Sequence, residues 1–213
     1  MTARYTLHGI FLSGPTYKVG LMLTLCGEAF DYEHVNLREG AHKKPEFLKL
    51  NRYGQVPVLV DNSNGKALCQ SGAILDYLAD KTGKFGGATL DDRLRAREWL
   101  FWGWDRFDAP VYRLRTWKKG FRQFEPAVVQ LYDAERKAAF DTLEQHFASG
   151  HDYLAGEHAT IADIDLYGVA ALAHEGDYDV AAHPHVVQWM KRIEALPHFK
   201  SPDTLLPPES RKA

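Results

Sequence analysis

The feature that most constrains the fold is a change in hydrophobic pattern near residue 82. Up to that point, short strand-like stretches alternate with helical ones in the order β-α-β-α-β-β-α. This order predicts a mixed sheet with helices packed against it. Beyond the glycine-rich stretch Thr82–Gly87, every long segment favours helix and none resembles a strand. We therefore expect an α/β domain at 1–82, a linker at 83–90 and an all-helical domain at 91–213.

The spacing of apolar residues and the turn signals locate the individual elements. In the first domain the expected strands are Tyr5–Ile10, Phe30–Leu37, Val56–Val60 and a short one near Ala67-Leu68. Its expected helices lie between Ser13 and Gly27, at Lys44–Leu50 and after Ser71. The expected helices of the second domain are Asp91–Trp117, Pro126–Phe147, Ile161–His174 and Val186–Leu196. An Asn64-Gly65 pair predicts a hairpin between the last two strands.

Charge and composition exclude several classes of protein. The 213 residues carry 26 Lys and Arg against 28 Asp and Glu, so the formal charge of -2 gives no basis for non-specific nucleic-acid binding. No apolar run approaches the roughly 20 residues of a membrane-spanning helix. The first residues, Met1–Tyr5, lack the apolar core of a signal peptide. We therefore expect a cytoplasmic protein that binds neither nucleic acid nor membrane.

The chain has two cysteines, Cys26 and Cys69, and they do not form a C-x-x-C pair. This count excludes a disulfide scaffold and a cysteine-based zinc site, and it fits a reducing compartment. Free cysteine is among the most buried residue types, so we expect both side chains to be buried and inert. His183 and His185 show no ligand spacing with carboxylates or cysteines, and no metal is expected.

The Val56-Pro57 step leads into a strand-like run. Proline donates no ladder hydrogen bond, so here it indicates a sheet edge or a bulge. With a cis bond, the Val56 N–H and C=O would face outward, free to pair with a peptide-like ligand. On the dipeptide alone, an ordinary trans proline is the more common arrangement.

Gln70 and Ser71 directly precede an amphipathic helix with Ile74, Leu75 and Leu78 on its apolar face. Ser71 occupies the position expected for the helix N-cap. A helix N-terminus also offers unpaired N–H groups and a partial positive charge, which suit a carboxylate. Ser71 can therefore cap the helix, bind an anion or do both.

Another serine stands between the first strand and the first helix. Pro15 suits the first helical turn, so the N-terminus of this helix points towards the loop that contains Ser13. No G-x-S-x-G sequence surrounds Ser13, which argues against a Ser-His-Asp nucleophile. The Ser13 hydroxyl is either an ordinary turn residue or a hydrogen-bond donor to a bound thiolate.

These segments, in this order, resemble the glutathione transferase family over most of the chain. Tyr5–Leu78 is similar to the thioredoxin-like N-terminal domain of that family, and Asn51–Leu59 to the segment that carries its cis-proline. In the second domain, Thr160–Asp163 resembles the family's helix-capping box. In such a box the Thr160 hydroxyl can accept from the N3 amide, and the Asp163 carboxylate can accept from the Thr160 amide. The resemblance implies a thioredoxin-like domain followed by an all-helical domain, with a cis bond at Val56-Pro57.

The resemblance also implies roles for single residues. Ser13 matches the catalytic serine of theta- and delta-like members, which would hydrogen-bond the glutathione thiolate. His42 and Lys43 would lie at the glycine end of glutathione. The other implied binding residues are Val56, beside Pro57, for the cysteinyl backbone, and Gln70 and Ser71 for the γ-glutamyl end.

Two nearby hydroxyls compete with Ser13 for the thiolate. Thr16 ranks second, because a hydroxyl inside the first helical turn can form a hydrogen bond with the nearby backbone instead of with a ligand. Tyr17 ranks third, because one further residue along the helix turns it by about 100°. The sequence therefore favours Ser13, with Thr16 and Tyr17 as alternatives.

Aromatic residues gather in the expected helix Asp91–Trp117. Successive positions point in different directions around a helix, so these rings cannot all face one core. Core packing, a dimer contact and an apolar groove beside the sulfur are all compatible with this spacing. The residues concerned are Trp99, Trp102, Trp104 and Tyr112.

The implied function is that of a cytoplasmic glutathione transferase, with glutathione as co-substrate, a homodimeric assembly and no metal. The thiolate would attack a small hydrophobic electrophile or reduce a peroxide, as in detoxification. The alternatives are a non-catalytic glutathione-transferase-like binding module and another glutathione-dependent enzyme, such as an isomerase or a dehalogenase. Fold alone separates none of these, but the complete set of implied site residues favours catalysis.

Overall fold

The structure, a computed structural model, describes residues 3–213 in two compact units. The first unit combines the residues up to Lys84 with Leu196–Ala213, and the second is Phe85–Ala195. The helical domain expected at 91–213 therefore ends earlier, because its last segment belongs to the first unit. Among the described residues, no helix has both the length and the apolar composition needed to cross a membrane.

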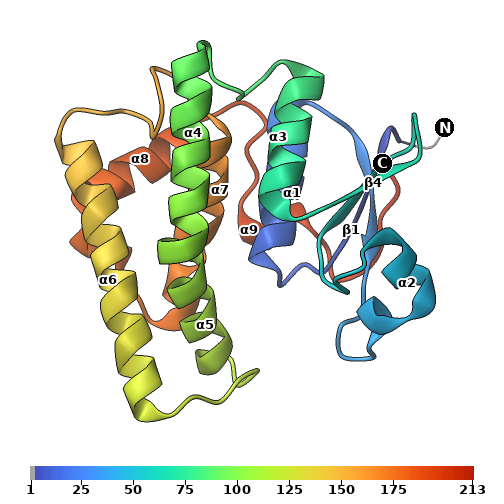
Figure 1. The fold of residues 1–213 in the computed structure, drawn as a ribbon, viewed down its shortest axis with the longest axis horizontal. Coiled ribbons are helices and arrows are strands. Elements are labelled where there is room, and N and C mark those ends of the chain that lie inside the picture. Colours follow the sequence, from blue (N-terminus) through green and yellow to red (C-terminus); the bar gives the residue numbers. More distant parts are fainter. Residues whose placement is uncertain (1–2) are drawn as a thin grey trace. The chain divides into compact units, whose positions relative to one another are not determined.

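A four-stranded mixed sheet lies at the centre of the first unit, as the alternating pattern predicts (Figure 1). Its strands are β1 (Tyr5–Gly9), β2 (Phe30–His34), β3 (Val58–Asp61) and β4 (Lys66–Cys69). The order across the sheet is β2-β1-β3-β4. β1 runs parallel to β2 and antiparallel to β3, and β4 runs antiparallel to β3. This sheet and its helices form the expected thioredoxin-like domain.

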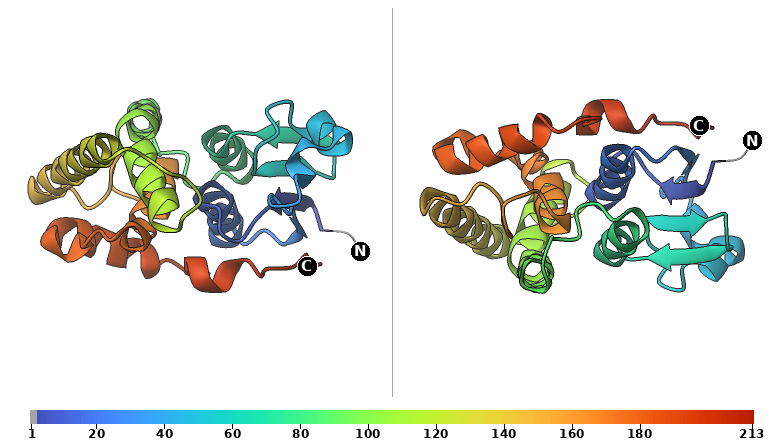
Figure 2. Two further views of the ribbon diagram at one scale, coloured as in Figure 1. Left: turned by 90° about the horizontal axis from the view of Figure 1, so that it is seen from below. Right: turned by 90° about the horizontal axis from the view of Figure 1, so that it is seen from above.

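Helices cover both faces of this sheet. They are α1 (Gly14–Cys26), α2 (Pro45–Leu50), α3 (Ser71–Thr82) and, from the end of the chain, α9 (Pro202–Leu205), with the 3-10 turn η1 (Ala41–Lys43) before α2. α1 and α3 lie side by side on one face, and α2 lies on the other (Figures 1 and 2). Leu7 and Leu59 face each other across β1 and β3 and are fully buried in this core.

α1 begins and ends where the sequence indicates. The Ser13 hydroxyl oxygen accepts a hydrogen bond from the Thr16 N–H at 3.2 Å, so Ser13 is the N-cap, and Pro15 lies in the first turn. Gly27 ends the helix in the left-handed conformation, with φ 76°. The position of Ser13 at the start of α1 is therefore set by local sequence.

Residues 196–213 return to the first unit and pack on α1 and β2. The Tyr17 hydroxyl of α1 donates to the Lys200 carbonyl at 3.0 Å. The backbone of Arg211 forms a bridge with Tyr32 on β2. These contacts between distant parts of the sequence are the reason why this segment does not belong to the helical unit.

Asp61 ties the β3–β4 hairpin to α3. The expected Asn64-Gly65 turn joins the two strands. The buried Asp61 carboxylate accepts hydrogen bonds from the Ser63 N–H at 2.9 Å and from the Tyr77 hydroxyl of α3 at 2.7 Å. Burial by itself raises the pKa of Asp61, but the hydrogen bonds outweigh burial and hold this pKa below its usual value.

We expect Asp61→Asn to lower the free energy of unfolding at pH 7 by about 1–3 kcal/mol, because a charged acceptor is lost. Since folding lowers the pKa of Asp61, its stabilisation is complete above the unfolded-state pKa of about 3.9 and is lost as the pH falls through the folded-state pKa. Urea unfolding at several pH values should therefore show the difference from wild type shrinking below about pH 4. Asp80→Asn, on the exposed surface of α3, is the control. A difference that does not change with pH would contradict this role of Asp61.

The second unit consists of helices and turns, as expected. The helices are α4 (Leu90–Trp102), α5 (Ala109–Lys118), α6 (Pro126–Ala148), α7 (Ile161–Ala170) and α8 (Pro184–Glu194). The π-helical segment η2 (Gly103–Asp108) joins α4 to α5, so the helix expected at Asp91–Trp117 is continuous but has a π-helical middle. Two 3-10 turns, η3 (Ala173–Gly176) and η4 (Val180–Ala182), lie between α7 and α8.

Thr160 and Asp163 form the expected capping box at the start of α7. The Asp163 carboxylate accepts a hydrogen bond from the Thr160 N–H at 2.8 Å. It also accepts one from the indole N–H of Trp189 on α8 at 2.9 Å. This fully buried carboxylate therefore both caps α7 and joins α7 to α8.

Candidate active site

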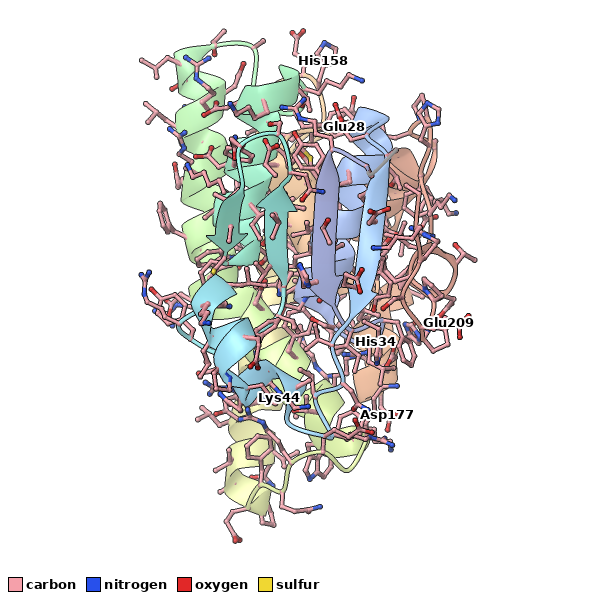
Figure 3. The ribbon with its side chains drawn as sticks, turned by 90° about the vertical axis from the view of Figure 1, so that its right-hand side faces the viewer. Glu28, His34, Lys44, His158, Asp177 and Glu209 are labelled. Carbon is pink, nitrogen blue, oxygen red and sulfur yellow. The ribbon has the colours of Figure 1, made fainter. Side chains whose placement is uncertain are left out.

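The strand register brings the ends of several strands to one edge of the sheet. His8, near the end of β1, pairs with Val58 at the start of β3, and Val58 pairs with Cys69 at the end of β4. β2 is parallel to β1 and also ends here, at His34 (Figure 3). The adjoining segments, residues 10–13, 41–57 and 69–71, are called the site edge below. They contain all the predicted site residues: Ser13, His42, Lys43, Val56, Pro57, Gln70 and Ser71.

Ser13 is half-buried at the site edge. Its hydroxyl oxygen accepts the Thr16 N–H, while its own proton enters no hydrogen bond within residues 3–213. The Ser13 N–H donates to the Ile10 carbonyl at 2.9 Å, which closes the loop before α1. A hydrogen bond accepted by a hydroxyl polarises it and strengthens it as a donor. Ser13 can therefore donate a hydrogen bond to an anion.

The two competing hydroxyls are directed elsewhere. Thr16 is fully buried and packs so closely on Gly9 that a Cβ at that glycine would overlap its side chain. The Thr16 hydroxyl has no hydrogen-bond partner among the described residues, so the expected bond to the local backbone is absent. The reason is that this side chain faces β1. The Tyr17 hydroxyl is engaged by the Lys200 carbonyl.

Asn51 shapes the loop before Val56, a role that the sequence pattern does not reveal. This buried side chain donates to the Gln55 carbonyl at 2.6 Å and accepts the Tyr53 N–H at 3.0 Å. The Val56-Pro57 bond that follows is cis, as the family resemblance predicts. Within the part of the chain that the structure describes, the Val56 N–H and C=O make no hydrogen bond. The Val56 backbone is therefore open to a peptide-like ligand.

His42 and Lys43 lie on η1, next to Gly54 in the loop before Val56. The Lys43 ammonium donates to the Gly54 carbonyl at 3.2 Å. A Cβ at Gly54 would lie 3.0 Å from the His42 carbonyl oxygen, so the two segments are in close contact. The His42 Nδ1 is buried and has no hydrogen-bond partner in residues 3–213. Buried polar atoms are normally paired, and a bound ligand is one source of such a partner.

α3 begins differently from the sequence prediction. Gln70, not Ser71, occupies the N-cap position, and its side chain makes no capping hydrogen bond. Gln70 has φ 68° and ψ 116°, a backbone conformation that side-chain-bearing residues rarely adopt. Because Gln70 holds this non-helical conformation, the buried Ser71 becomes the first helical residue rather than the cap. The first-turn N–H groups of α3 are therefore left without a side-chain cap.

Positive charge gathers at the site edge. α1 and α3 both begin here, and each helix N-terminus carries a partial positive charge. Lys43 and Lys44 are both exposed and add two ammonium groups, and Figure 3 shows Lys44 at this edge. This arrangement suits a ligand with more than one carboxylate.

Neither cysteine offers a reactive thiolate. Burial raises the pKa of Cys26, and it also raises the pKa of Cys69. Cys69 is half-buried rather than buried as expected, because β4 is an edge strand. The thiolate is the nucleophilic form, so both side chains are inert near neutral pH. Among the described residues, no group of three His, Cys, Asp or Glu side chains could hold a metal ion.

The aromatic residues of the long helical stretch divide between ring packing and a pocket within the second unit. The ring centroid of Trp99 lies 5.1 Å from that of Trp102 and 4.9 Å from that of His146 on α6. The Tyr112 hydroxyl donates to a backbone carbonyl of α7 at 3.4 Å. Trp102 also lines a pocket of about 320 Å³ between this stretch and α6. Trp99 and Tyr112 therefore serve packing within the unit, and Trp104 is half-buried.

Gln70→Gly is expected to be more stable than a matched control, because glycine adopts a positive φ without a side-chain clash. The control is Gln123→Gly in the α5–α6 loop, where φ is not positive. We expect a difference in the free energy of unfolding of about 1–2 kcal/mol in favour of Gln70→Gly. Urea unfolding of both variants measures it. An equal loss of stability in both would show that the Gln70 backbone is not strained.

Two family models match the chain. One, described as the N-terminal domain of glutathione S-transferase, matches residues 3–80. The other, described as the C-terminal domain of glutathione S-transferase, matches residues 119–197. The two matches together cover more than half of the chain and fall in the two parts that the sequence pattern distinguishes.

Relatives and solved structures extend the similarity over nearly the whole chain. Glutathione S-transferase 3 of Zea mays is 33% identical over 211 residues, which cover 94% of each protein. Maleylacetoacetate isomerase of Rhizobium meliloti (strain 1021) is also 33% identical over 211 residues, covering 94% of this chain and 96% of that protein. The crystal structure of a glutathione S-transferase from Pseudomonas fluorescens Pf-5 is 29% identical and has a TM-score of 0.88, covering 94% of this chain and 99% of that one. The chain therefore belongs to the glutathione S-transferase family.

Proposed function

We propose that this chain is a glutathione transferase in which the Ser13 hydroxyl stabilises the glutathione thiolate. The observation that carries the proposal is the hydrogen bonding of the Ser13 hydroxyl. It accepts the capping hydrogen bond from Thr16 and keeps a proton to donate, at an edge that also offers the open backbone of Val56. Glutathione is a tripeptide with one thiol and two carboxylates, and the site edge has a complementary group for each.

Each part of glutathione has a proposed partner. The glycine carboxylate is assigned to His42 and Lys43, supported by the unpartnered His42 Nδ1 and by the charge of Lys43. The cysteinyl backbone is assigned to the N–H and C=O of Val56, in the manner of strand pairing. The γ-glutamyl carboxylate is assigned to Gln70, Ser71 and the uncapped N-terminus of α3.

The proposed role of Ser13 follows from acid–base chemistry. A cysteine-type thiol has a pKa of about 8.5 and is mostly protonated near neutral pH. A hydrogen bond from Ser13, together with the positive end of α1, favours the thiolate and lowers the pKa of the bound thiol. Since Cys26 and Cys69 are inert, glutathione supplies the only thiol that this mechanism uses. The thiolate then forms a C–S bond with an electrophilic carbon, and the leaving group departs with the electron pair.

We propose a small hydrophobic electrophile or a peroxide as the second substrate, and detoxification in the cytoplasm as the setting. The support is the similarity to the maize transferase. Glutathione and free cysteine thiols both belong to reducing compartments.

A glutathione-dependent isomerase is the second candidate, and the similarity to maleylacetoacetate isomerase favours it. In that reaction the same thiolate would add to a double-bond carbon, allow rotation and then leave, so glutathione would be returned. Measuring free thiol during turnover distinguishes the two, because only the transferase consumes glutathione in proportion to product. A non-catalytic binding module would bind glutathione without lowering the pKa of its thiol.

We also propose that the protein is a homodimer. Leu90, Leu94 and Phe101 of α4 are each more than half exposed. Their spacing places them along one side of the helix. An exposed apolar stripe indicates a surface that a partner covers, and the family resemblance makes a second copy of this chain the proposed partner.

We expect wild-type protein to bind glutathione with a dissociation constant between micromolar and millimolar, roughly -8 to -4 kcal/mol. Isothermal titration calorimetry measures this value. The dipeptide Cys-Gly is the control ligand and should bind more weakly, because it presents no γ-glutamyl carboxylate to α3. The absence of binding at about 10 mM glutathione, beyond this weak limit, would rule out the proposed function.

Ser13→Ala should raise the pKa of the bound thiol and lower turnover with a model electrophile, while glutathione affinity stays largely intact. A single donor to a charged acceptor contributes on the order of 1.5–3 kcal/mol, which is about one to two pKa units. The spectroscopic titration of the bound thiolate and the turnover rate measure the two effects.

Matched variants separate the two roles of Ser13. Ser13→Ala also removes the N-cap and should cost about 1 kcal/mol of stability, whereas Ser13→Gly should lose the donor at a stability cost of only a few tenths of a kcal/mol. Tyr17→Phe should keep full turnover, because that hydroxyl is engaged by Lys200. Full turnover in Ser13→Ala, combined with its loss in Tyr17→Phe or Thr16→Val, would show that Ser13 is not the donor.

A further inference from the structure

Tyr32 of β2 is paired with the end of the described chain through its backbone. Its N–H donates to the Arg211 carbonyl, and its carbonyl accepts the Arg211 N–H, both at 2.7 Å. This antiparallel bridge lies outside the four-stranded sheet, on the open side of β2. Residues 210–213 therefore cover backbone groups that an edge strand otherwise leaves unpaired.

Neighbouring contacts hold this segment on β2. The Ser210 hydroxyl accepts the His34 N–H at 2.9 Å. The Lys212 ammonium lies 2.6 Å from a Glu33 carboxylate oxygen. In Figure 3, Glu209, just before the segment, lies on the side of the sheet where β2 ends at His34. The segment is thus attached along the last residues of β2.

The side chain of Tyr32 reaches the loop between β1 and α1. It is fully buried, and its hydroxyl donates to the Gly9 carbonyl at 3.3 Å. Its ring lies edge-on to the His34 ring, with ring centroids 6.4 Å apart, and the His34 ring lies 6.2 Å from the Phe11 ring. Burial, the largest cause, raises the pKa of this phenol to about 12, so the hydroxyl keeps its proton at neutral pH. Tyr32 therefore contacts the end of β1 through its hydroxyl, and it contacts the loop that follows through the rings of His34 and Phe11.

Ser13 belongs to the same loop. Its N–H donates to the Ile10 carbonyl, so Phe11 lies inside the turn that places Ser13. A hydrogen bond weakens steeply when its angle or length departs from the optimum. A looser hold on Gly9, directly before this turn, would therefore misdirect the Ser13 hydroxyl without removing it.

We propose that Tyr32 is a positioning residue for Ser13 and that residues 210–213, paired with its backbone, hold Tyr32 in place. The effect on catalysis rests on the proposed function of Ser13 towards glutathione. The ordering of the Phe11–Ser13 loop does not depend on that function and is tested separately.

The test compares Tyr32→Phe with wild type, because phenylalanine keeps the ring and removes the hydrogen bond from the hydroxyl to the Gly9 carbonyl. Amide hydrogen exchange at Phe11 and Ser13 should become about three- to tenfold faster, the range expected for a lost hydrogen bond. The apparent pKa of the bound glutathione thiol should rise and kcat should fall by a similar factor, whereas KM for glutathione should not change.

One further variant and a control test the contribution of residues 210–213. Arg211→Pro removes the N–H that bonds to Tyr32 and should produce the same changes more weakly. As a control, Lys137→Ala on α6 removes only an exposed ion pair with Asp141 and should match wild type. If Tyr32→Phe does not fold, amide hydrogen exchange at Phe11 and Ser13 is measured in Arg211→Pro instead.

The outcomes are distinct. If the amide hydrogen-exchange rates of Phe11 and Ser13 in Tyr32→Phe equal those of wild type, the proposal is overturned, whatever the activity of the variant. Faster exchange with an unchanged thiol pKa and kcat would overturn the link between Tyr32 and the Ser13 hydroxyl. If wild type binds no glutathione, the proposed function fails, and the exchange rates alone decide whether Tyr32 orders the loop.

Discussion

The hydrogen bond from the Thr16 N–H to the Ser13 hydroxyl oxygen is the contact on which the proposed chemistry depends. It satisfies one of the free N–H groups at the start of α1 and fixes the Ser13 side chain against the helix. Because the hydroxyl acts here as an acceptor, its proton stays available for a thiolate. A single contact thus combines a structural role, the start of the helix, with the proposed catalytic one.

The sheet register supplies the other groups around Ser13. β1 and β4 end at the edge where β3 begins, so a helix N-terminus, an open backbone and a second helix N-terminus meet there. Contacts away from the edge keep these parts in place. Asp61 bonds to Tyr77 and so holds α3 on the β3–β4 hairpin, while Asn51 holds the loop that leads to Val56. The residues proposed to touch glutathione therefore depend on a buried polar framework that does not touch it.

Local patterns predict much of this unit, and long-range contacts account for what they miss. The order of strands and helices and the end of α1 at Gly27 depend on residues close in sequence, and the structure confirms them. Gln70 takes the cap position of α3 because of a backbone conformation that no local preference favours. The role of Asn51 becomes visible only when its burial is known, since a buried amide must find partners. The pairing of Arg211 with β2 joins segments far apart in sequence, which periodicity cannot indicate.

The most direct test of the central claim is a crystal structure of the protein in complex with glutathione. The account predicts that the sulfur lies within hydrogen-bonding distance of the Ser13 hydroxyl oxygen and that the cysteinyl backbone pairs with Val56. A sulfur held by the Thr16 or Tyr17 hydroxyl, or one beyond the reach of Ser13, would contradict it.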